Sequence, residues 1–409
     1  MKLNQRGFTL IEMIVVMAVF ITVLMVTAGS FNTILTQASK LFRSEESNIE
    51  GIVGLEMLRH DLQQAGYGLF TETTDYADEA ADAPASTYND APNNVPRPIV
   101  AGNNVAATTV DATTIASGSD YLAIKGTTVG RTKSAQKWTF LRISSGVVSV
   151  QKWQSGAENL ESSDKAILIR KQFGTPMRSS IVRDPLGDHY YAYSDVAFEH
   201  LSSAAQSIYT VYGVHTPSST DTANSLRFPF NRSDYFVATP GSTSSIKLPA
   251  YCAPGTGILY KTTVKHANGK LLYLPLLDCV LDMQVVLGWD MNNDGVIDTY
   301  SNADGSQVSS GIAEGTVLNV QAALGTTNNN SLTLFPNMRS SLKMVKVYVL
   351  AQNGRRDTNY TSPSPLTVGD AGEASLTRVG GLSLAANQLN YRWKLYRLVV
   401  RPKNLLSNQ

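Results

Sequence analysis

The stretch Gly7-Phe8-Thr9-Leu10-Ile11-Glu12 stands near the start of the chain, shortly after the basic side chains of Lys2 and Arg6. An apolar run continues from it, and the segment Met13–Phe31 contains no Asp, Glu, Lys or Arg. That length is close to the ~20 apolar residues that cross a bilayer as a helix. Ionisable side chains inside a membrane segment are costly and usually functional, so the position of Glu12 predicts a specific role for its carboxylate.

The flanks of the apolar run indicate how it sits in a membrane. Lys2 and Arg6 precede it and place the N-terminus on the cytoplasmic side, where basic residues are retained. Two alternatives remain: an ordinary secretory signal peptide, for which Thr27-Ala28-Gly29 would imitate a cleavage site, and a plain anchor that is never cut. An ordinary signal peptide has an apolar core of ~7–15 residues, whereas this run is longer and would include Glu12.

A helical pattern extends past the apolar run. We expect one helix from Phe8 to Ala65, with Gly66 as its C-cap and a length of about 87 Å at 1.5 Å per residue. Its first half would lie in the membrane, and its second half would pack an apolar stripe on a globular head. That stripe recurs at steps of three and four: Ile34, Leu35, Ala38, Leu41, Phe42, Ile49, Ile52 and Val53. Three glycines weaken the helix by ~1 kcal/mol each relative to Ala: Gly29, Gly51 and Gly54.

The composition excludes one large class of partner. The chain has 409 residues, 34 basic and 33 acidic side chains, and a net charge of +1. Without a strong basic balance, nothing favours nucleic acid as the main partner. The head, about residues 67–409, is large enough for its own core and for two subdomains. We find no nucleophile elbow, P-loop or dinucleotide motif, so the sequence does not indicate an enzyme.

The head reads as rich in β-strands. Residues 67–100 contain many Ala, Asp, Thr, Asn and Pro residues and predict a connecting loop. Residues 301–330 and 356–380 predict further long loops. Beyond residue 100, short runs of alternating or continuous apolar residues predict strands at 121–124, 138–143, 147–150, 166–169, 209–214, 258–264, 271–274, 281–289, 345–349 and 391–400. Asn353-Gly354, at the end of one of these strands, is a strong turn signal.

Cys252 and Cys279 are the two cysteines of the chain. The predicted topology places both outside the cytoplasm, where disulfides form and persist. We therefore expect a Cys252–Cys279 bridge, worth about 3 kcal/mol. Two buried free thiols are the alternative, since spacing alone does not decide it. A zinc site is disfavoured because no His lies at ligand spacing from either cysteine.

The segment 290–301 resembles a calcium-binding loop. Oxygen-bearing side chains occupy its first, third, fifth and ninth positions, Gly295 stands sixth for a tight turn, and the seventh residue offers its backbone carbonyl. A hard cation needs six to eight such oxygens at ~2.3–2.6 Å. The twelfth position should be Glu but is Ser301, which predicts weaker binding or completion by Asp304 or water. The expected Ca²⁺ ligands are Asp290, Asn292, Asp294, Val296 and Asp298. A polar hairpin turn without an ion is the alternative.

Several segments together resemble one family. Gly7–Glu12 with its short basic leader is similar to the type III signal of type IV pilins and type II secretion pseudopilins. Met57–Gly68 looks like the helix end of PilW-type minor pilins, and Leu281–Tyr300 resembles the acidic glycine loop near their C-terminus. Met344–Leu350 and Trp393–Pro402 fit the final strands of that family. The middle of the chain, about residues 70–270, matches nothing that we can quote.

The resemblance implies an α+β, type IV pilin-like fold with a long N-terminal helix packed on a large β-rich head. Its implied divisions are a leader (1–7), the pilin helix (8–66, transmembrane over about 8–31), a connecting loop (67–100) and the head (101–409). A prepilin peptidase would cut after Gly7 and N-methylate Phe8. The carboxylate of Glu12 would then pair with the N-terminal amine of a neighbouring subunit, because a charge in hydrocarbon needs an opposite charge.

The implied function is that of a minor pilin that primes pilus assembly or sits at the filament tip, since so large a head is awkward in a tightly wound shaft. The implied partners are other minor and major pilins, the prepilin peptidase, the inner-membrane assembly platform and a tip adhesin. Before assembly the head would be periplasmic, and afterwards the chain would be at the cell surface. A minor pseudopilin of type II secretion and a membrane-anchored binding protein that never polymerises are the alternatives.

Overall fold

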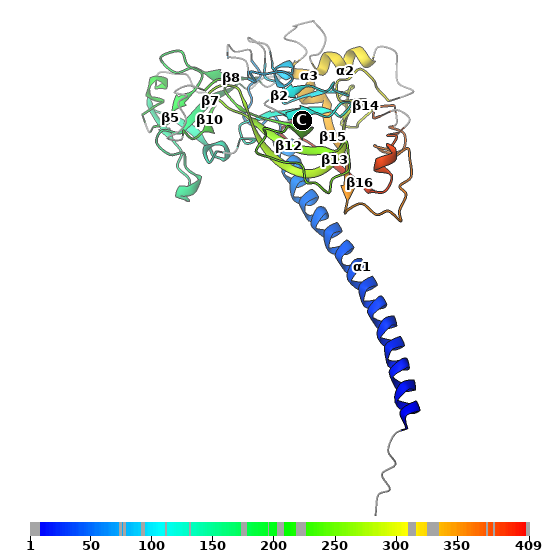
Figure 1. The fold of residues 1–409 in the computed structure, drawn as a ribbon. Coiled ribbons are helices and arrows are strands. Elements are labelled where there is room, and N and C mark those ends of the chain that lie inside the picture. The colour runs from blue at the N-terminus through cyan, green and yellow to red at the C-terminus, as the bar shows by residue number, and fades with distance from the viewer. Residues whose placement is uncertain are drawn as a thin grey trace, which may run out of the picture.

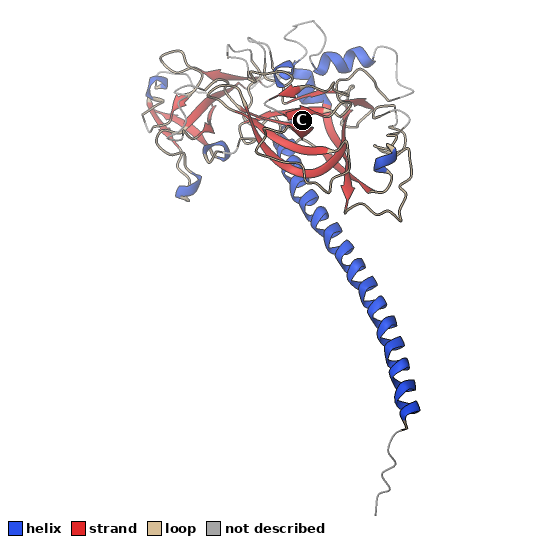
Figure 2. Cartoon of the chain, viewed as in Figure 1, coloured by secondary structure: helices blue, strands red, loops and turns tan. Residues whose placement is uncertain are grey.

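The computed structural model describes residues 9–72, 76, 79–90, 95–110, 113–130, 132–172, 178–194, 196–202, 208–217, 226–309, 316–324, 335–373, 375–378 and 381–405. One long helix, α1 (Leu10–Gln64), runs away from a head made mainly of strands (Figures 1 and 2). Its 55 residues agree with the predicted helix to within a few residues at each end. The expected α+β arrangement, a long N-terminal helix followed by a large β-rich head, is therefore confirmed.

The main sheet of the head contains ten strands within the described residues. All pairs are antiparallel, and the short strands β2 (Thr109–Val110), β3 (Thr113–Ile115) and β14 (Thr299–Asn302) flank the central path. The central path runs in the order β1 (Ile99–Gly102), β4 (Tyr121–Gly126), β11 (Asn231–Pro240), β12 (Gly257–Val264), β13 (Leu271–Trp289), β15 (Leu342–Asn353) and β16 (Arg392–Val400).

A second, smaller sheet is inserted between β4 and β11. These two strands pair directly, from Asn231 opposite Gly126 to Phe236 opposite Tyr121, while the chain between them builds a separate lobe. The lobe appears in green at the left of Figure 1. Within the described residues its strands are β6 (Val147–Val150), β5 (Trp138–Ser144), β10 (Ile208–His215), β7 (Lys165–Gln172) and β8 (Arg178–Val182), in that order, with β9 (Tyr191–Ala192) beside β7.

The C-terminal part of α1 packs on one face of the main sheet. Leu55, Leu58 and Leu62 share a core with the alternate side chains of β13 and β15 that point towards the helix. The opposite face of these strands is covered by residues from the long connection between β15 and β16. The helix thus supplies one layer of the head, and alternation along each strand supplies both faces of the sheet.

Two features differ from the sequence-based expectations. Residues 67–100 were predicted to be a connecting loop, but their described part contributes Phe70, Tyr76 and Glu79 to the buried interior. The segment 301–330, predicted to be a loop, contains the helix α2 (Thr316–Leu324). Asn353-Gly354 turns the chain at the end of β15, as its turn signal predicts, and β16 begins only at Arg392. A second short helix, α3 (Phe335–Ser341), precedes β15.

Candidate functional site

Glu12 forms part of the N-terminal cap of α1. Thr9 is the N-cap residue, and its backbone N and its hydroxyl Oγ1 each donate to Glu12 Oε2 at 2.9 Å. The Glu12 backbone N donates back to Thr9 Oγ1 at 3.4 Å, which completes a capping box. Within a single chain the carboxylate therefore satisfies helix-terminal donors. The predicted processing residues Gly7 and Phe8 lie outside the described residues.

The N-terminal half of α1 has the length and composition of a membrane span. Residues Leu10–Ser39 form such a segment. The head does not bury the apolar window within it. Large apolar side chains along it are more than half exposed, for example Ile11, Val19 and Phe20. A surface like this is stable only in lipid or against other apolar helices.

An ion pair joins the second half of α1 to the main sheet. Asp61 is buried, and its Oδ2 lies 2.6 Å from Lys261 Nζ of β12 and accepts from the Tyr235 hydroxyl of β11 at 2.7 Å. His60, on the adjacent exposed face, lies 3.5 Å from the other Asp61 oxygen. That hydrogen bond raises the pKa of His60. No sequence pattern predicts this ion pair, because a single Asp in a helix usually lies on a solvated face.

A second buried ion network explains why residues 67–100 belong to the head. Glu79 lies 3.1 Å from Lys125 Nζ and 2.9 Å from Arg232 Nη1, and all three side chains are fully buried. Asp90 also pairs with Lys125, and with Arg97. Burial opposes ionisation of Asp90, but the two cations outweigh it and lower its pKa to about 2. These pairs fix the segment to β4 and β11 rather than leaving it as a surface loop.

The calcium-like loop forms a closed turn. The Asp290 carboxylate is buried and accepts from the backbone N of Asp294 at 3.1 Å and of Gly295 at 2.9 Å. Asp298 accepts from the backbone N of Met291 at 2.9 Å. Asn292 donates its side-chain amide to Asp294 at 3.1 Å. The oxygen-bearing side chains therefore close the turn by hydrogen bonds to its backbone and to each other.

Several of these oxygens already have partners in the loop. Lys343 Nζ lies 3.6 Å from Asp290 Oδ2 and supplies a positive charge where a cation would bind. Ser301, at the twelfth position, is buried and accepts from the Trp289 indole N–H at 2.8 Å. Among the described residues, no three His, Cys, Asp or Glu side chains gather in a metal-holding group. Calcium binding at this loop stays a prediction.

Cys252 and Cys279 form a disulfide in the structure, with their Cα atoms 5.0 Å apart. Cys279 lies in β13, at a point where its pairing with β12 shifts register. The bridge ties the loop after β11 to the middle of the longest strand. The bridge therefore has a structural role. Cys279 lies ten residues before the end of β13, away from the loop at 290–301.

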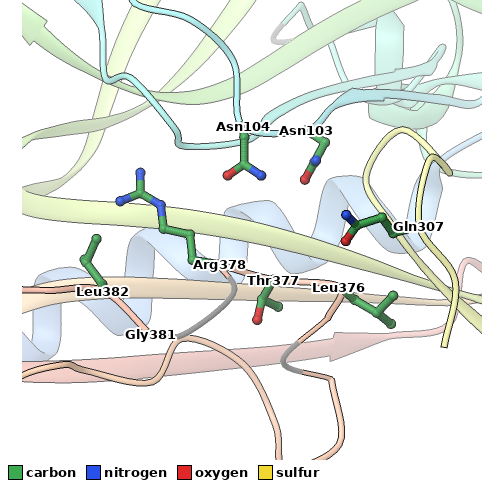
Figure 3. A pocket seen from close by; sticks show the side chains of 8 residues that line it. All are labelled: Asn103, Asn104, Gln307, Leu376, Thr377, Arg378, Gly381 and Leu382. Atoms are coloured by element: carbon green, nitrogen blue, oxygen red, sulfur yellow. The ribbon is translucent and has the colours of Figure 1, made fainter. Parts of the chain in front are cut away.

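A polar hollow of about 360 Å³ lies beside the long β15–β16 connection. Figure 3 shows Asn103 and Asn104 on one side of it and Thr377 and Arg378 on the other. Arg378 donates to two backbone carbonyls, of Gly118 at 3.1 Å and of Ser117 at 3.0 Å, and its Nε lies 3.4 Å from Asp282 Oδ2. We assign this arginine a structural role, in which it fastens the connection to the sheet.

Two family models match the chain. Residues 2–28 match the prokaryotic N-terminal methylation motif, and residues 234–404 match type IV pilus-assembly protein W. The second match begins in β11 and ends after β16, so it covers much of the main sheet and leaves out the inserted lobe. The helix end at Met57–Gly68, which sequence reasoning had included in the resemblance, lies outside both matches.

A search of curated proteins returned no match. Among solved structures the chain is similar to a type IV-like pilin from Thermus thermophilus, with 16% sequence identity and a TM-score of 0.22. The similarity covers 43% of this chain and 66% of that protein, so the chain spans just under two thirds of its relative's length.

The methylation motif, the exposed apolar helix and the β-rich head together support a type IV pilin-like protein. The match of residues 234–404 to pilus-assembly protein W supports, more narrowly, a PilW-type head. The matched families are structural proteins of pili and not enzymes. The apolar helix and the methylation motif fit a membrane-anchored pilin.

Proposed function

We propose that this chain is a minor pilin of a type IV pilus, which primes assembly or occupies the filament tip. The observation that carries the proposal is the combination of a 55-residue helix, apolar and exposed over Leu10–Ser39, with a PilW-type head. Cleavage after Gly7 and methylation of Phe8 would precede assembly. Before assembly the head is periplasmic, and in the filament it is at the cell surface.

A second exposed surface of α1 supports contact with a neighbouring pilin. Ile49, Ile52 and Val53 are 61%, 62% and 60% exposed although they lie close to the head. Ile52 and Val53 line a hollow of about 600 Å³ between the helix and the lobe. Met57 lines the same hollow. Exposed apolar side chains beside a hollow are typical of an interface that another chain covers.

The shape of the head supports a position at the filament end. The inserted lobe extends the head sideways from the helix axis (Figure 1). In a tightly wound shaft each head must leave room for the next, whereas a tip subunit has no neighbour above it. The same geometry is compatible with a partner such as a tip adhesin seated on the head.

The helix start supports the docking role of Glu12. Its carboxylate lies at the first turn of α1, next to the site of the predicted new N-terminus. A neighbouring subunit acquires a free α-amino group there only after cleavage. An ion pair between the two is favourable in an apolar filament core because water is absent.

A gene deletion tests the proposal. We expect loss of most surface filaments from the deletion strain, counted by electron microscopy, with recovery on expression of the full chain. Export of type II secretion substrates serves as the second readout. Loss of secretion with normal filaments would move the assignment to a secretion pseudopilin. Normal filaments and normal secretion would leave an anchored binding protein that does not polymerise.

A further inference from the structure

The inserted lobe carries a groove. None of its described lining residues belongs to α1 or to the segment that matches pilus-assembly protein W. It has a volume of about 720 Å³, within the range of ~300–1,000 Å³ that is usual for ligand pockets. It lies at the start of β5, beside the loop that contains the short 3₁₀ helix η3 (Gly156–Glu158). Its lining falls within residues 133–161, outside both family matches.

Aromatic side chains form one wall of the groove. Trp138 and Trp153 pack edge to face, with ring centroids 5.3 Å apart. Phe140, two residues along the same strand, is not part of the lining, but its ring packs against Trp138 with centroids 5.1 Å apart and is 42% exposed. Aromatic rings of this size are usually buried, so their partial exposure at a groove points to a contact surface.

Hydrogen bonds hold the two tryptophans in place. The Trp153 indole N–H donates to the Trp138 carbonyl at 2.8 Å. The Asn159 side chain accepts from the Trp153 backbone N at 2.7 Å and donates to its carbonyl at 3.1 Å. The aromatic wall is therefore preorganised, and binding there requires little additional ordering.

Charged side chains of both signs form the rim. Lys133, Glu158 and Glu161 are exposed, and Lys137 Nζ lies 3.0 Å from Glu161 Oε1. Two basic and two acidic groups give these lining residues no net charge. The rim therefore offers donors and acceptors together, without a field that favours an ion.

We propose that this groove binds a neutral oligosaccharide. A pyranose ring has an apolar face of C–H groups, which packs on an aromatic ring, and an edge of hydroxyls that both donate and accept. The two tryptophans can pack on the apolar C–H face of the sugar. The ammonium and carboxylate groups of the rim can bind its hydroxyls, which both donate and accept. An acidic polysaccharide is not favoured, because the rim residues carry no net positive charge. A proline-rich peptide needs aromatic surfaces but few carboxylates and is the principal competitor.

Saturation-transfer NMR on the full chain in lipid nanodiscs, free of sugar-headgroup detergents, tests the proposal. The probes are maltotetraose, cellotetraose, chitotetraose and mannotetraose, with decaproline as the competing peptide. We expect at least one sugar to receive saturation on its ring C–H protons. Trp153→Ala should weaken that binding about ten-fold or more, whereas Trp393→Phe, on the main sheet, should leave it unchanged.

Glu158→Ala keeps the test decisive if Trp153→Ala perturbs the lobe. Glu158 is exposed, so its replacement should not affect folding, and loss of one hydrogen-bond acceptor should weaken binding about two- to ten-fold. The proposal is overturned if none of the four sugars binds, if binding is indifferent to both Trp153 and Glu158, or if decaproline binds in their place. None of these readouts requires filament assembly, so they are independent of the minor-pilin assignment.

Discussion

At the scale of single residues, Glu12 has two separable properties: an acceptor that caps α1 and a negative charge. Glu12→Gln keeps an acceptor at the same capping position but removes the charge, whereas Glu12→Ala removes both. We predict that both variants insert into the membrane and that both are incorporated into filaments about ten-fold less than the parent, corresponding to about 1.4 kcal/mol. Immunoblots of membrane and filament fractions provide the measurement. Normal incorporation of Glu12→Gln would show that the charge is not needed for docking.

Calcium binding is tested best at Asp294, because replacing Asp290 would also break its contact with Lys343. We predict that calcium raises the thermal unfolding midpoint of the parent and that Asp294→Ala abolishes the increase. A hundred-fold excess over Kd adds about 2.7 kcal/mol to the free energy of unfolding. A midpoint of the parent that is indifferent to both calcium and a chelator would rule out the site and leave a hydrogen-bonded turn.

Asp282 predicts a pH dependence. Burial raises its pKa to about 6, although Arg378 lowers it in part. A raised carboxyl pKa stabilises the fold below the unfolded value of 3.8, and this contribution is lost as the pH rises through 6. Asp282→Asn mimics the protonated form. Urea titrations of the detergent-solubilised chain should show its stability, relative to the parent, rising by about 3 kcal/mol between pH 4 and pH 7. If the difference in stability between Asp282→Asn and the parent does not change with pH, the pKa of Asp282 is not raised.

At the scale of elements, the contact of α1 with β13 depends on Gly54. A Cβ added there would lie 2.5 Å from the Leu276 carbonyl oxygen, a backbone atom that cannot move alone, whereas one at Gly29 would meet nothing within 4 Å. We predict that Gly54→Ala destabilises the solubilised chain by about 1–3 kcal/mol despite the better helix propensity of Ala. Gly29→Ala is the matched control and should be neutral or slightly stabilising. Equal thermal midpoints for the two variants would contradict this packing.

Local sequence patterns predict part of the fold. The helix, most strands and the closed turn at Asp290 follow from periodicity and spacing, because these signals are local. The strand β11 was missed because Arg232 and Asp234 interrupt its apolar pattern. Both are buried and pair with each other at 2.6 Å. Arg232 also pairs with Glu79, and Asp234 accepts from the Tyr121 hydroxyl. These further partners come from distant parts of the chain, and no local pattern predicts such pairs.

At the scale of the whole molecule, the two parts of the chain have different origins of stability. The head has buried cores on both faces of the main sheet, tied by ion networks and one disulfide. The first half of α1 has no such partner in the described structure and needs lipid or neighbouring helices. We predict that a subunit built this way is held in a membrane before assembly and is stabilised by neighbouring helices on entering a filament.

The decisive measurement is mass spectrometry of filaments sheared from the native cells, with quantification of this chain and of its N-terminal peptide. We predict a trace amount beside a dominant pilin, with a peptide that begins at N-methylated Phe8. Processed protein confined to the membrane fraction, with filaments that lack it, would contradict the minor-pilin assignment.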